Sequence, residues 1–323
     1  MSWIALAATL VAGPATAPCP ADVLAELTAT TDPAPFHLTC FATLPPGRSV
    51  TRPIVIEGEE GSGAGLDCRG GSLGRPGVAS TTRTPTLSIR SRLDGDGWSR
   101  PRGVRLADCT LHGNARIWGL GADGRIEELR ASSRAPGHTG RAQAAAPTDI
   151  LFHRITFIAT GSIPLYIGPG VTGVRVDEGR FTGRSVSTAI YLDAESAGTV
   201  VQGVDFDIAT AREQIAVDGS ARNRLVDNRF RRSDRGGVFL YRNCGEDGVI
   251  RHRAPTDNTI TGNRFEGVSW LWPRAVVLGS REGGRRYCGD DAGWPFGSSA
   301  DDGDNAARNV VRGNTVDYRL WPF

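Results

Sequence analysis

Two carboxylates and a phenol recur at nearly equal intervals in the C-terminal half of the chain. Asp193, Asp218 and Tyr241 are separated by 25 and 23 residues, and each follows a short apolar segment. Carboxylates and a phenol can act as general acid and base, and paired carboxylates can bind Ca²⁺. If the intervals reflect stacked repeats, the three side chains form one line on the surface.

Arginines, aromatic residues and a histidine accompany this line. Guanidinium groups bind carboxylates through paired hydrogen bonds, and aromatic faces suit sugar rings. The candidate catalytic residues are Tyr241, His252, Arg235, Arg242 and Asp218. The candidate substrate-binding residues are Tyr191, Asp193, Arg212, Phe239, Arg274 and Tyr287. The candidate Ca²⁺ ligands are Asp193 and Asp218, or Asp290 and Asp291, and no other cofactor is indicated.

The same residues also have a purely structural interpretation. Outward Asp and Arg side chains on neighbouring repeats can form a surface ion-pair ladder. Tyr191 and Phe239 can pack beneath a loop, and His252, within Arg-His-Arg, can be a solvated loop residue. The Asp290–Asp291 pair can belong to a solvated turn.

The elements that position these residues follow from an internal repeat. Asn, four residues, Asn, one residue and a large apolar residue occur at 223–230, 258–265 and 309–316. Asn tolerates left-handed corners, and its amide can bond to the same amide in the next layer. The repeat predicts a solenoid of stacked β-coils.

The spacing extends the repeat upstream. Phe157, Phe181, Phe206 and Phe230 follow one another at 24, 25 and 24 residues. A second aligned strand follows each anchor, with aliphatic first and third positions that predict an inward face. The outward central residues are then Tyr166, Tyr191, Ala216, Phe239 and Val277, and the residues two positions on are Gly168, Asp193, Asp218, Tyr241 and Gly279. A period near 24 with strand alternation favours a parallel β-helix over a helical solenoid or a propeller.

The rest of the chain sets boundaries and compartment. Residues 1–17 are typical of a signal peptide whose apolar run is too short to span a membrane, and residues 18–323 form one domain. Residues 22–28 predict a capping helix, whereas 120–147, 242–256 and 280–305 predict long loops. The net charge of +2 does not favour nucleic acid as a partner. All 37 basic residues are Arg, so no lysine can act as a base.

Six cysteines indicate an oxidising compartment, secreted or periplasmic. Cys68 and Cys109 lie in similar segments of adjacent coils, close enough to bond. Cys244 and Cys288 lie in look-alike loops, and Cys19 and Cys40 remain as a third pair. The absence of Cys-x-x-Cys spacing argues against a metal site.

The layout resembles the pectin-lyase-like right-handed parallel β-helix superfamily. The resemblance rests on the capping helix, the segments 44–58, 65–71 and 104–113, and the asparagine corners. It implies an all-β, single-domain right-handed parallel β-helix with a short N-terminal capping helix. It also implies carbohydrate as the partner and a substrate groove along the outward side of one sheet. The catalytic motifs of polygalacturonases, alginate epimerases and pectate lyases are absent, so the resemblance assigns no catalytic residue.

The leading hypothesis is a lyase, or an epimerase, that acts on a uronate-containing polysaccharide. A base removes the proton beside the carboxylate, and an arginine or Ca²⁺ neutralises that carboxylate. One alternative is a glycoside hydrolase that uses Asp193 and Asp218, about 5 Å apart on consecutive coils. The other is a non-catalytic polysaccharide-binding or surface protein.

Overall fold

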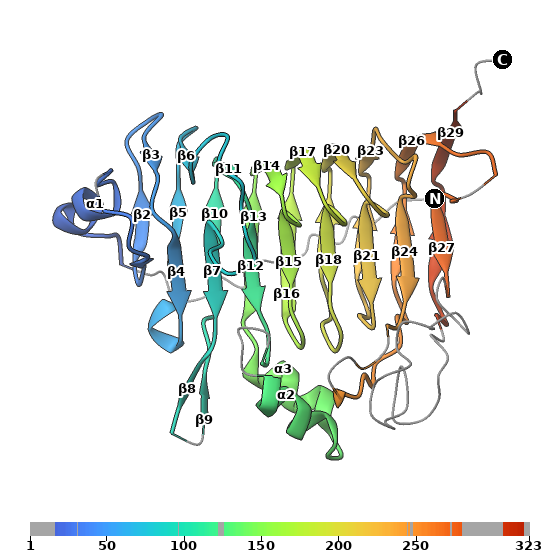
Figure 1. Ribbon diagram of the computed structural model, residues 1–323, viewed down its shortest axis with the longest axis horizontal. Coiled ribbons are helices and arrows are strands. Elements are labelled where there is room, and N and C mark those ends of the chain that lie inside the picture. Colours follow the sequence, from blue (N-terminus) through green and yellow to red (C-terminus); the bar gives the residue numbers. More distant parts are fainter. Residues whose placement is uncertain are drawn as a thin grey trace, which may run out of the picture.

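The fold is built from three long parallel sheets. The structure is a computed structural model that describes residues 17–30, 32–95, 97–121, 126–243, 245, 248–271, 273–279 and 306–319. Within these residues each sheet has nine strands, and each coil contributes one strand to each sheet. This arrangement, drawn in Figure 1, confirms the predicted all-β, single-domain right-handed parallel β-helix.

The strands of each sheet stack in chain order. Sheet I consists of β1 (Phe36–His37), β4 (Ile54–Glu57), β7 (Leu87–Arg90), β12 (Ala115–Trp118), β15 (Leu165–Ile167), β18 (Ile190–Leu192), β21 (Ile215–Asp218), β24 (Val238–Tyr241) and β27 (Val276–Leu278). Sheet II consists of β2 (Phe41–Thr43), β5 (Gly65–Asp67), β10 (Arg105–Ala107), β13 (Thr148–His153), β16 (Thr172–Asp177), β19 (Val200–Gln202), β22 (Arg224–Val226), β25 (Thr259–Thr261) and β28 (Val310–Arg312). Sheet III consists of β3 (Ser49–Val50), β6 (Ser72–Leu73), β11 (Thr110–His112), β14 (Thr156–Gly161), β17 (Arg180–Ser185), β20 (Asp205–Thr210), β23 (Arg229–Phe230), β26 (Arg264–Val268) and β29 (Thr315–Tyr318).

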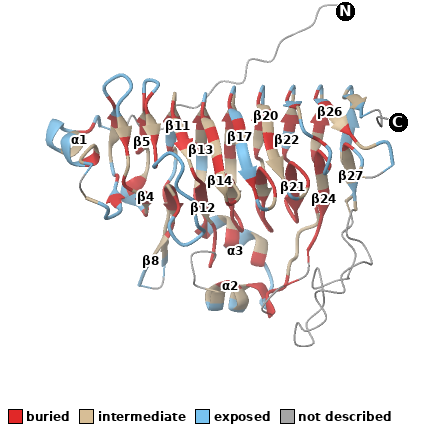
Figure 2. Cartoon of the chain, turned by 45° about the horizontal axis from the view of Figure 1, so that its top comes forward, coloured by how far each residue is buried: buried red, intermediate tan, exposed pale blue. Residues whose placement is uncertain are grey.

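The predicted phenylalanine anchors form a continuous internal stack. The rings of Phe157, Phe181, Phe206, Phe230 and Phe265 are fully buried and nearly parallel, with centroids 4.5–4.9 Å apart. Figure 2 shows this inward burial along the length of the solenoid. Offset aromatic stacking adds to the apolar area removed from water, so each coil is registered on the one before it.

The asparagines form two ladders between coils, as predicted. The side-chain oxygen of Asn258 accepts hydrogen bonds from the backbone and side-chain amides of Asn223, at 2.9 and 2.8 Å. Asn263 accepts in the same way from Asn228, at 3.0 and 2.9 Å. Asn314 continues the second ladder by accepting from Asn263.

The left-handed corners lie one residue earlier than the repeat suggested. The positive φ angles belong to the residues directly before the asparagines, which are Arg222, Asp227, Asp257, Gly262, Arg308 and Gly313. The asparagines are therefore needed for their amide hydrogen bonds and not for their backbone conformation.

The N-terminal end of the solenoid is covered by α1 (Ala21–Leu27), which buries Leu27 against the first coil.

Two predicted disulfides are confirmed: Cys19–Cys40 holds this N-terminal segment, and Cys68–Cys109 joins stacked coils with Cα atoms 4.9 Å apart. The predicted Cys244–Cys288 pair lies outside the described residues. None of the described helices is both long and apolar enough to cross a membrane.

The long loop predicted at 120–147 does leave the coils, but part of it is helical. The segment contains α2 (Ile126–Ser133) and α3 (His138–Ala145), which lie beyond the carboxyl ends of the sheet I strands in Figure 1. The two helices bury a small cluster that includes Leu129 and Ala142. The apolar side of each helix is too narrow to give a helical period in the sequence. Smaller additions are the 3₁₀ turn Glu59–Gly61 and the hairpin of β8 (Arg92–Asp94) and β9 (Gly97–Ser99).

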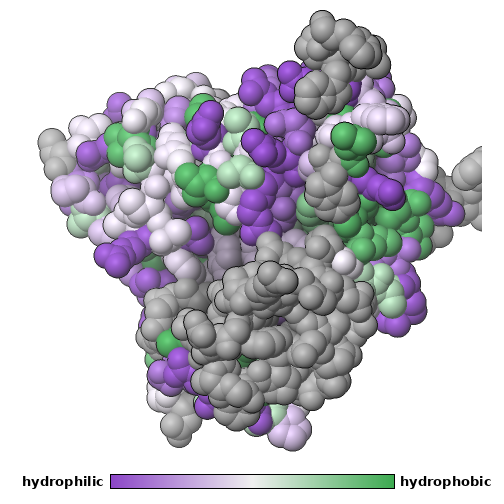
Figure 3. Space-filling view, turned by 45° about the vertical axis from the view of Figure 1, so that its right-hand side comes forward, coloured by the Kyte–Doolittle hydropathy of each residue, from purple (hydrophilic) through white to green (hydrophobic). Residues whose placement is uncertain are grey.

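The C-terminal coils expose more apolar surface than the others. Trp270, Leu271, Val310 and Tyr318 are exposed there, and Figure 3 shows apolar residues gathered among polar ones at this end. The site described next lies elsewhere, along the outward face of sheet I.

The asparagine ladder yields a stability prediction. Replacing Asn263 by Ala removes its bonds to Asn228 and Asn314 and its bond to the Leu225 carbonyl, all in a buried corner. We expect a loss of about 2–4 kcal/mol of unfolding free energy, measured by urea denaturation. The control Asn314→Ala, on a half-exposed coil, should lose less, and equal losses would contradict a role for burial.

Candidate functional site

The predicted outward column of sheet I is present. Tyr166 pairs with Tyr191, Tyr191 with Ala216, Ala216 with Phe239, and Phe239 with Val277. Asp218 pairs with Tyr241 in the next strand, one step further along the same face. The fold therefore brings the candidate residues of the aligned strands onto one surface.

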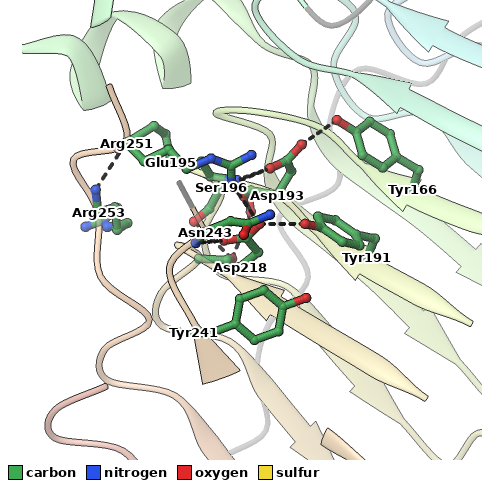
Figure 4. A network of polar contacts seen from close by, with 12 residues as sticks. Tyr166, Tyr191, Asp193, Glu195, Ser196, Asp218, Tyr241, Asn243, Arg251 and Arg253 are labelled. Carbon is green, nitrogen blue, oxygen red and sulfur yellow. Dashed lines mark hydrogen bonds and ion pairs between the residues drawn. The ribbon is translucent and has the colours of Figure 1, made fainter. Parts of the chain in front are cut away.

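Asp193 and Asp218 lie at the centre of a closed hydrogen-bond network. The Tyr166 hydroxyl donates to Asp193 Oδ2 and the Tyr191 hydroxyl to Asp218 Oδ2, each at 2.5 Å. Arg251 Nη1 donates to Asp193 Oδ1 at 2.9 Å and to Asp218 Oδ2 at 2.8 Å. Figure 4 shows the two carboxylates between the tyrosines and this arginine.

Backbone amides complete the network. Asp193 Oδ1 accepts from the Ala194 amide at 2.8 Å, and Asp218 Oδ1 accepts from the Asn243 amide at 2.7 Å. All four carboxylate oxygens are thus engaged, and both residues are buried. Burial raises the pKa of Asp218, with Arg251 opposing the shift. A glycosidase needs one carboxyl free to donate a proton and one to attack, and this pair offers neither.

Arg251 comes from the strap, which we define as residues 248–255 between β24 and β25. The strap is held on α2: the Ile250 amide donates to Ser133 Oγ at 3.0 Å, and His252 Nε2 lies 2.7 Å from the Ser133 carbonyl oxygen. Glu195 Oε1 accepts from the amides of His252 and Arg253. The predicted loop at 242–256 is therefore, in its described part, a fixed cover over the network.

Tyr241 sits in a second buried cluster. Its hydroxyl accepts a hydrogen bond from Arg212 Nη2 at 2.6 Å and donates to Glu213 Oε1 at 3.0 Å. Tyr241 is fully buried and Glu213 nearly so. Of the predicted base and acid, Tyr241 is thus buried with its hydroxyl engaged, and His252 lies within the strap with its Nε2 beside the Ser133 carbonyl oxygen.

The other candidates are more scattered. Arg235 is 65% exposed, and its nearest carboxylate belongs to the neighbouring Asp234. Arg274 is exposed, Phe239 is half-buried on the column, and Arg242 is buried beside the strap. Tyr287, Asp290 and Asp291 lie outside the described residues.

The calcium site stays a prediction. The described part of the chain contains no group of three or more His, Cys, Asp or Glu residues placed to hold a metal ion. At Asp193 and Asp218 the positive charge comes instead from Arg251, which contacts both carboxylates.

An accessible groove of about 690 Å³ lies further toward the N-terminus on the same outward face. Its floor is formed by side chains of β1, β4, β7, β12 and β15, and one wall by residues 82–85. The lining residues with aromatic rings or ionisable groups are His37, Arg83, Arg90, Arg116, Trp118 and Tyr166. Tyr166 joins groove and network, because its ring lines the groove while its hydroxyl is held by Asp193.

Arg116 and Trp118 are not among the site residues predicted from the sequence. They lie on β12, whose residues pair with those of β15 in the register of the later coils. A signal was present: Ala115–Trp118 reads apolar, Arg, apolar, Trp, the same alternation as the aligned strands. Irregular spacing upstream of Phe157 hid it.

Comparison with known proteins gives structural likenesses only. No known protein family and no curated protein sequence matches the chain. The chain is similar to PfbA, a surface adhesin of Streptococcus pneumoniae, with 14% identity, a TM-score of 0.41, and coverage of 80% of this chain and 61% of that one. It therefore spans less than two thirds of the adhesin it matches.

Two further likenesses are weaker. The periplasmic alginate epimerase AlgG matches with 11% identity and a TM-score of 0.24 over 88% of this chain and 79% of that one. A PL6 alginate lyase in complex with a trisaccharide matches with 10% identity and a TM-score of 0.23 over 80% and 60%. The class defined by this fold is the parallel β-helix protein, and the site must be interpreted from its own residues.

The network makes Arg251 a structural requirement. Replacing Arg251 by Met leaves two buried carboxylates facing each other without a cation, so we expect a loss of about 3–5 kcal/mol. Adding Asp193→Asn and Asp218→Asn to this variant should recover part of the loss. Thermal and urea unfolding measure both effects, and no recovery would show that the charge balance is not the cause.

His138 predicts a pH dependence of stability. Its ring is buried and contacts the ring of His252, with centroids 5.3 Å apart. Burial lowers the pKa of His138 to about 4; His252 and Arg141 act in the same direction, and Glu195 opposes them. The unfolded state therefore binds more protons between about pH 4 and 6.5, so stability should fall as the pH drops through this window.

Thermal unfolding at several pH values between 4 and 7.5 measures this effect. His138→Gln should remove much of the difference between pH 4.5 and 7.5, whereas the exposed His37→Gln should retain it. The same pH profile in all three proteins would contradict the role of His138.

Proposed function

We propose that this protein binds an acidic polysaccharide along the outward face of sheet I. The observation that supports this proposal most strongly is the groove of about 690 Å³. It combines aromatic rings and guanidinium groups on a rigid floor of stacked strands. Aromatic rings suit the apolar faces of sugars, and guanidinium groups suit their carboxylates. A floor of parallel strands, one per coil, also suits a linear chain of repeating units.

We propose a secreted or periplasmic location. Two disulfides, Cys19–Cys40 and Cys68–Cys109, require an oxidising compartment in most organisms. The signal peptide proposed for residues 1–17 fits this location.

The reaction we propose is β-elimination on a uronate, or the related epimerisation. A base takes the proton next to the carboxylate, and the electron pair left behind forms a carbon–carbon double bond. The glycosidic carbon–oxygen bond breaks, and its oxygen takes up a proton. The groove offers guanidinium groups for the carboxylate and the exposed imidazole of His37 as a base.

A binding protein without catalysis is the second candidate. It is favoured by the closed network at Asp193 and Asp218 and by the separate buried cluster around Tyr241, in which the side-chain oxygens of all three residues are engaged. The two candidates share the groove and differ only in turnover.

Isothermal titration calorimetry with polyuronate oligosaccharides tests the binding. Trp118→Ala should weaken binding about tenfold or more, because its ring lines the groove. The matched control Trp270→Ala, with a ring that is 73% exposed and outside the groove, should bind as the wild type does. Equal affinities for all three proteins would contradict the groove.

Absorbance near the ultraviolet edge during the same incubation distinguishes the two candidates. Elimination produces an unsaturated sugar, so a rising absorbance supports a lyase. Binding without any change in absorbance or mass contradicts elimination, and it supports the non-catalytic protein if NMR spectra also show an unchanged configuration of the sugar units, since epimerisation alters neither mass nor absorbance.

A further inference from the structure

Arg116 is the central, outward-facing residue of β12, yet its side chain is only 6% exposed. Its guanidinium carbon lies 4.9 Å from the ring centroid of Tyr166 and 5.4 Å from that of Trp118. The Trp118 indole donates from Nε1 to Ser88 Oγ at 2.8 Å, and the Tyr166 hydroxyl donates to Asp193. Both rings are therefore fixed by hydrogen bonds, and their centroids lie 6.1 Å apart, so the guanidinium packs against two neighbouring rings at the groove floor.

The Arg116 guanidinium has no anionic partner among the described residues. Its Nε is buried and has no hydrogen-bond acceptor. Two other arginines with little exposure are paired with carboxylates: Arg52 contacts Asp32 at 2.7 Å, and Arg251 contacts two aspartates. Arg90, which also lines the groove, is neutralised by Glu57 at 2.7 Å.

A buried cation without a counter-ion is unfavourable, and proteins rarely keep one. Burial lowers the pKa of Arg116, which shows the same penalty on the charged form. Cation–π contacts with two rings offset part of it, but they satisfy none of the N–H donors. An incoming anion would supply what the folded chain lacks.

We infer that Arg116 forms a carboxylate subsite, at which one uronate unit of an acidic polysaccharide is bound. This inference rests on the proposed function and identifies its specificity-determining residue. The planar guanidinium fork matches a carboxylate through two hydrogen bonds. Trp118 and Tyr166, which lie next to each other beside the guanidinium, offer aromatic surface to the sugar ring that carries the carboxylate.

Calorimetry with two matched ligands tests the subsite. One is a polyuronate oligosaccharide, and the other is the same oligosaccharide with its carboxyl groups reduced to alcohols. Wild-type protein should bind the acidic form at least tenfold more tightly than the reduced form. Arg116→Gln should lose that preference and bind both forms with the affinity that the wild type has for the reduced one. The control Arg232→Gln, which removes an exposed arginine just after β23, should keep the preference.

Thermal unfolding of the unliganded variants separates recognition from structure. Arg116→Gln removes an uncompensated buried charge, so its melting temperature should equal or exceed that of the wild type. A lowered melting temperature, together with an equal loss of affinity for both ligands, would mean that Arg116 has a structural role and would overturn the inference.

The outcomes also separate the inference from the proposed function. If wild-type protein binds no polyuronate, the proposed function fails and the subsite with it. If it binds polyuronate and Arg116→Gln retains the preference for the acidic form, the subsite alone is overturned.

Discussion

The exact stacking of one coil on the next is the constraint on which the whole structure depends. Inward phenylalanines lie ring on ring, and asparagine amides bond from coil to coil at both corners. A slip of one residue would turn every inward side chain outward, so the core holds the register tightly. The same register aligns the outward residues of sheet I, and any site on that face is a consequence of packing on the other side.

Buried charge is handled in two different ways along this face. Over the later coils, Arg251 from the strap contacts both Asp193 and Asp218, and hydroxyl and amide groups donate to the remaining carboxylate oxygens. Over the earlier coils, the guanidinium of Arg116 is buried against two neighbouring rings, and none of the described residues supplies a counter-ion. The first arrangement is complete without a ligand, and the second is not. Tyr166 connects them, because the closed network fixes the ring that lines the open groove.

The fold was predictable because its signals are local and repeated. The phenylalanine spacing gave the register that the strand pairs confirm, and similar flanking sequences identified Cys68 and Cys109 as partners. The candidate site was harder, since its chemistry depends on contacts between distant segments. Nothing near Asp193 in the sequence indicates that its carboxylate forms an ion pair with Arg251, 58 residues later. Arg116 was missed because the coils before Phe157 vary in length and lack the phenylalanine anchor, although their strand pattern is intact.

The central claim is that an acidic sugar chain lies over β7, β12 and β15. A crystal structure of the protein with a bound polyuronate oligosaccharide tests it most directly. We expect sugar rings against Trp118 and Tyr166, with one carboxylate within hydrogen-bonding distance of the Arg116 guanidinium. Sugar bound elsewhere, with this groove empty at saturating ligand, would contradict the account.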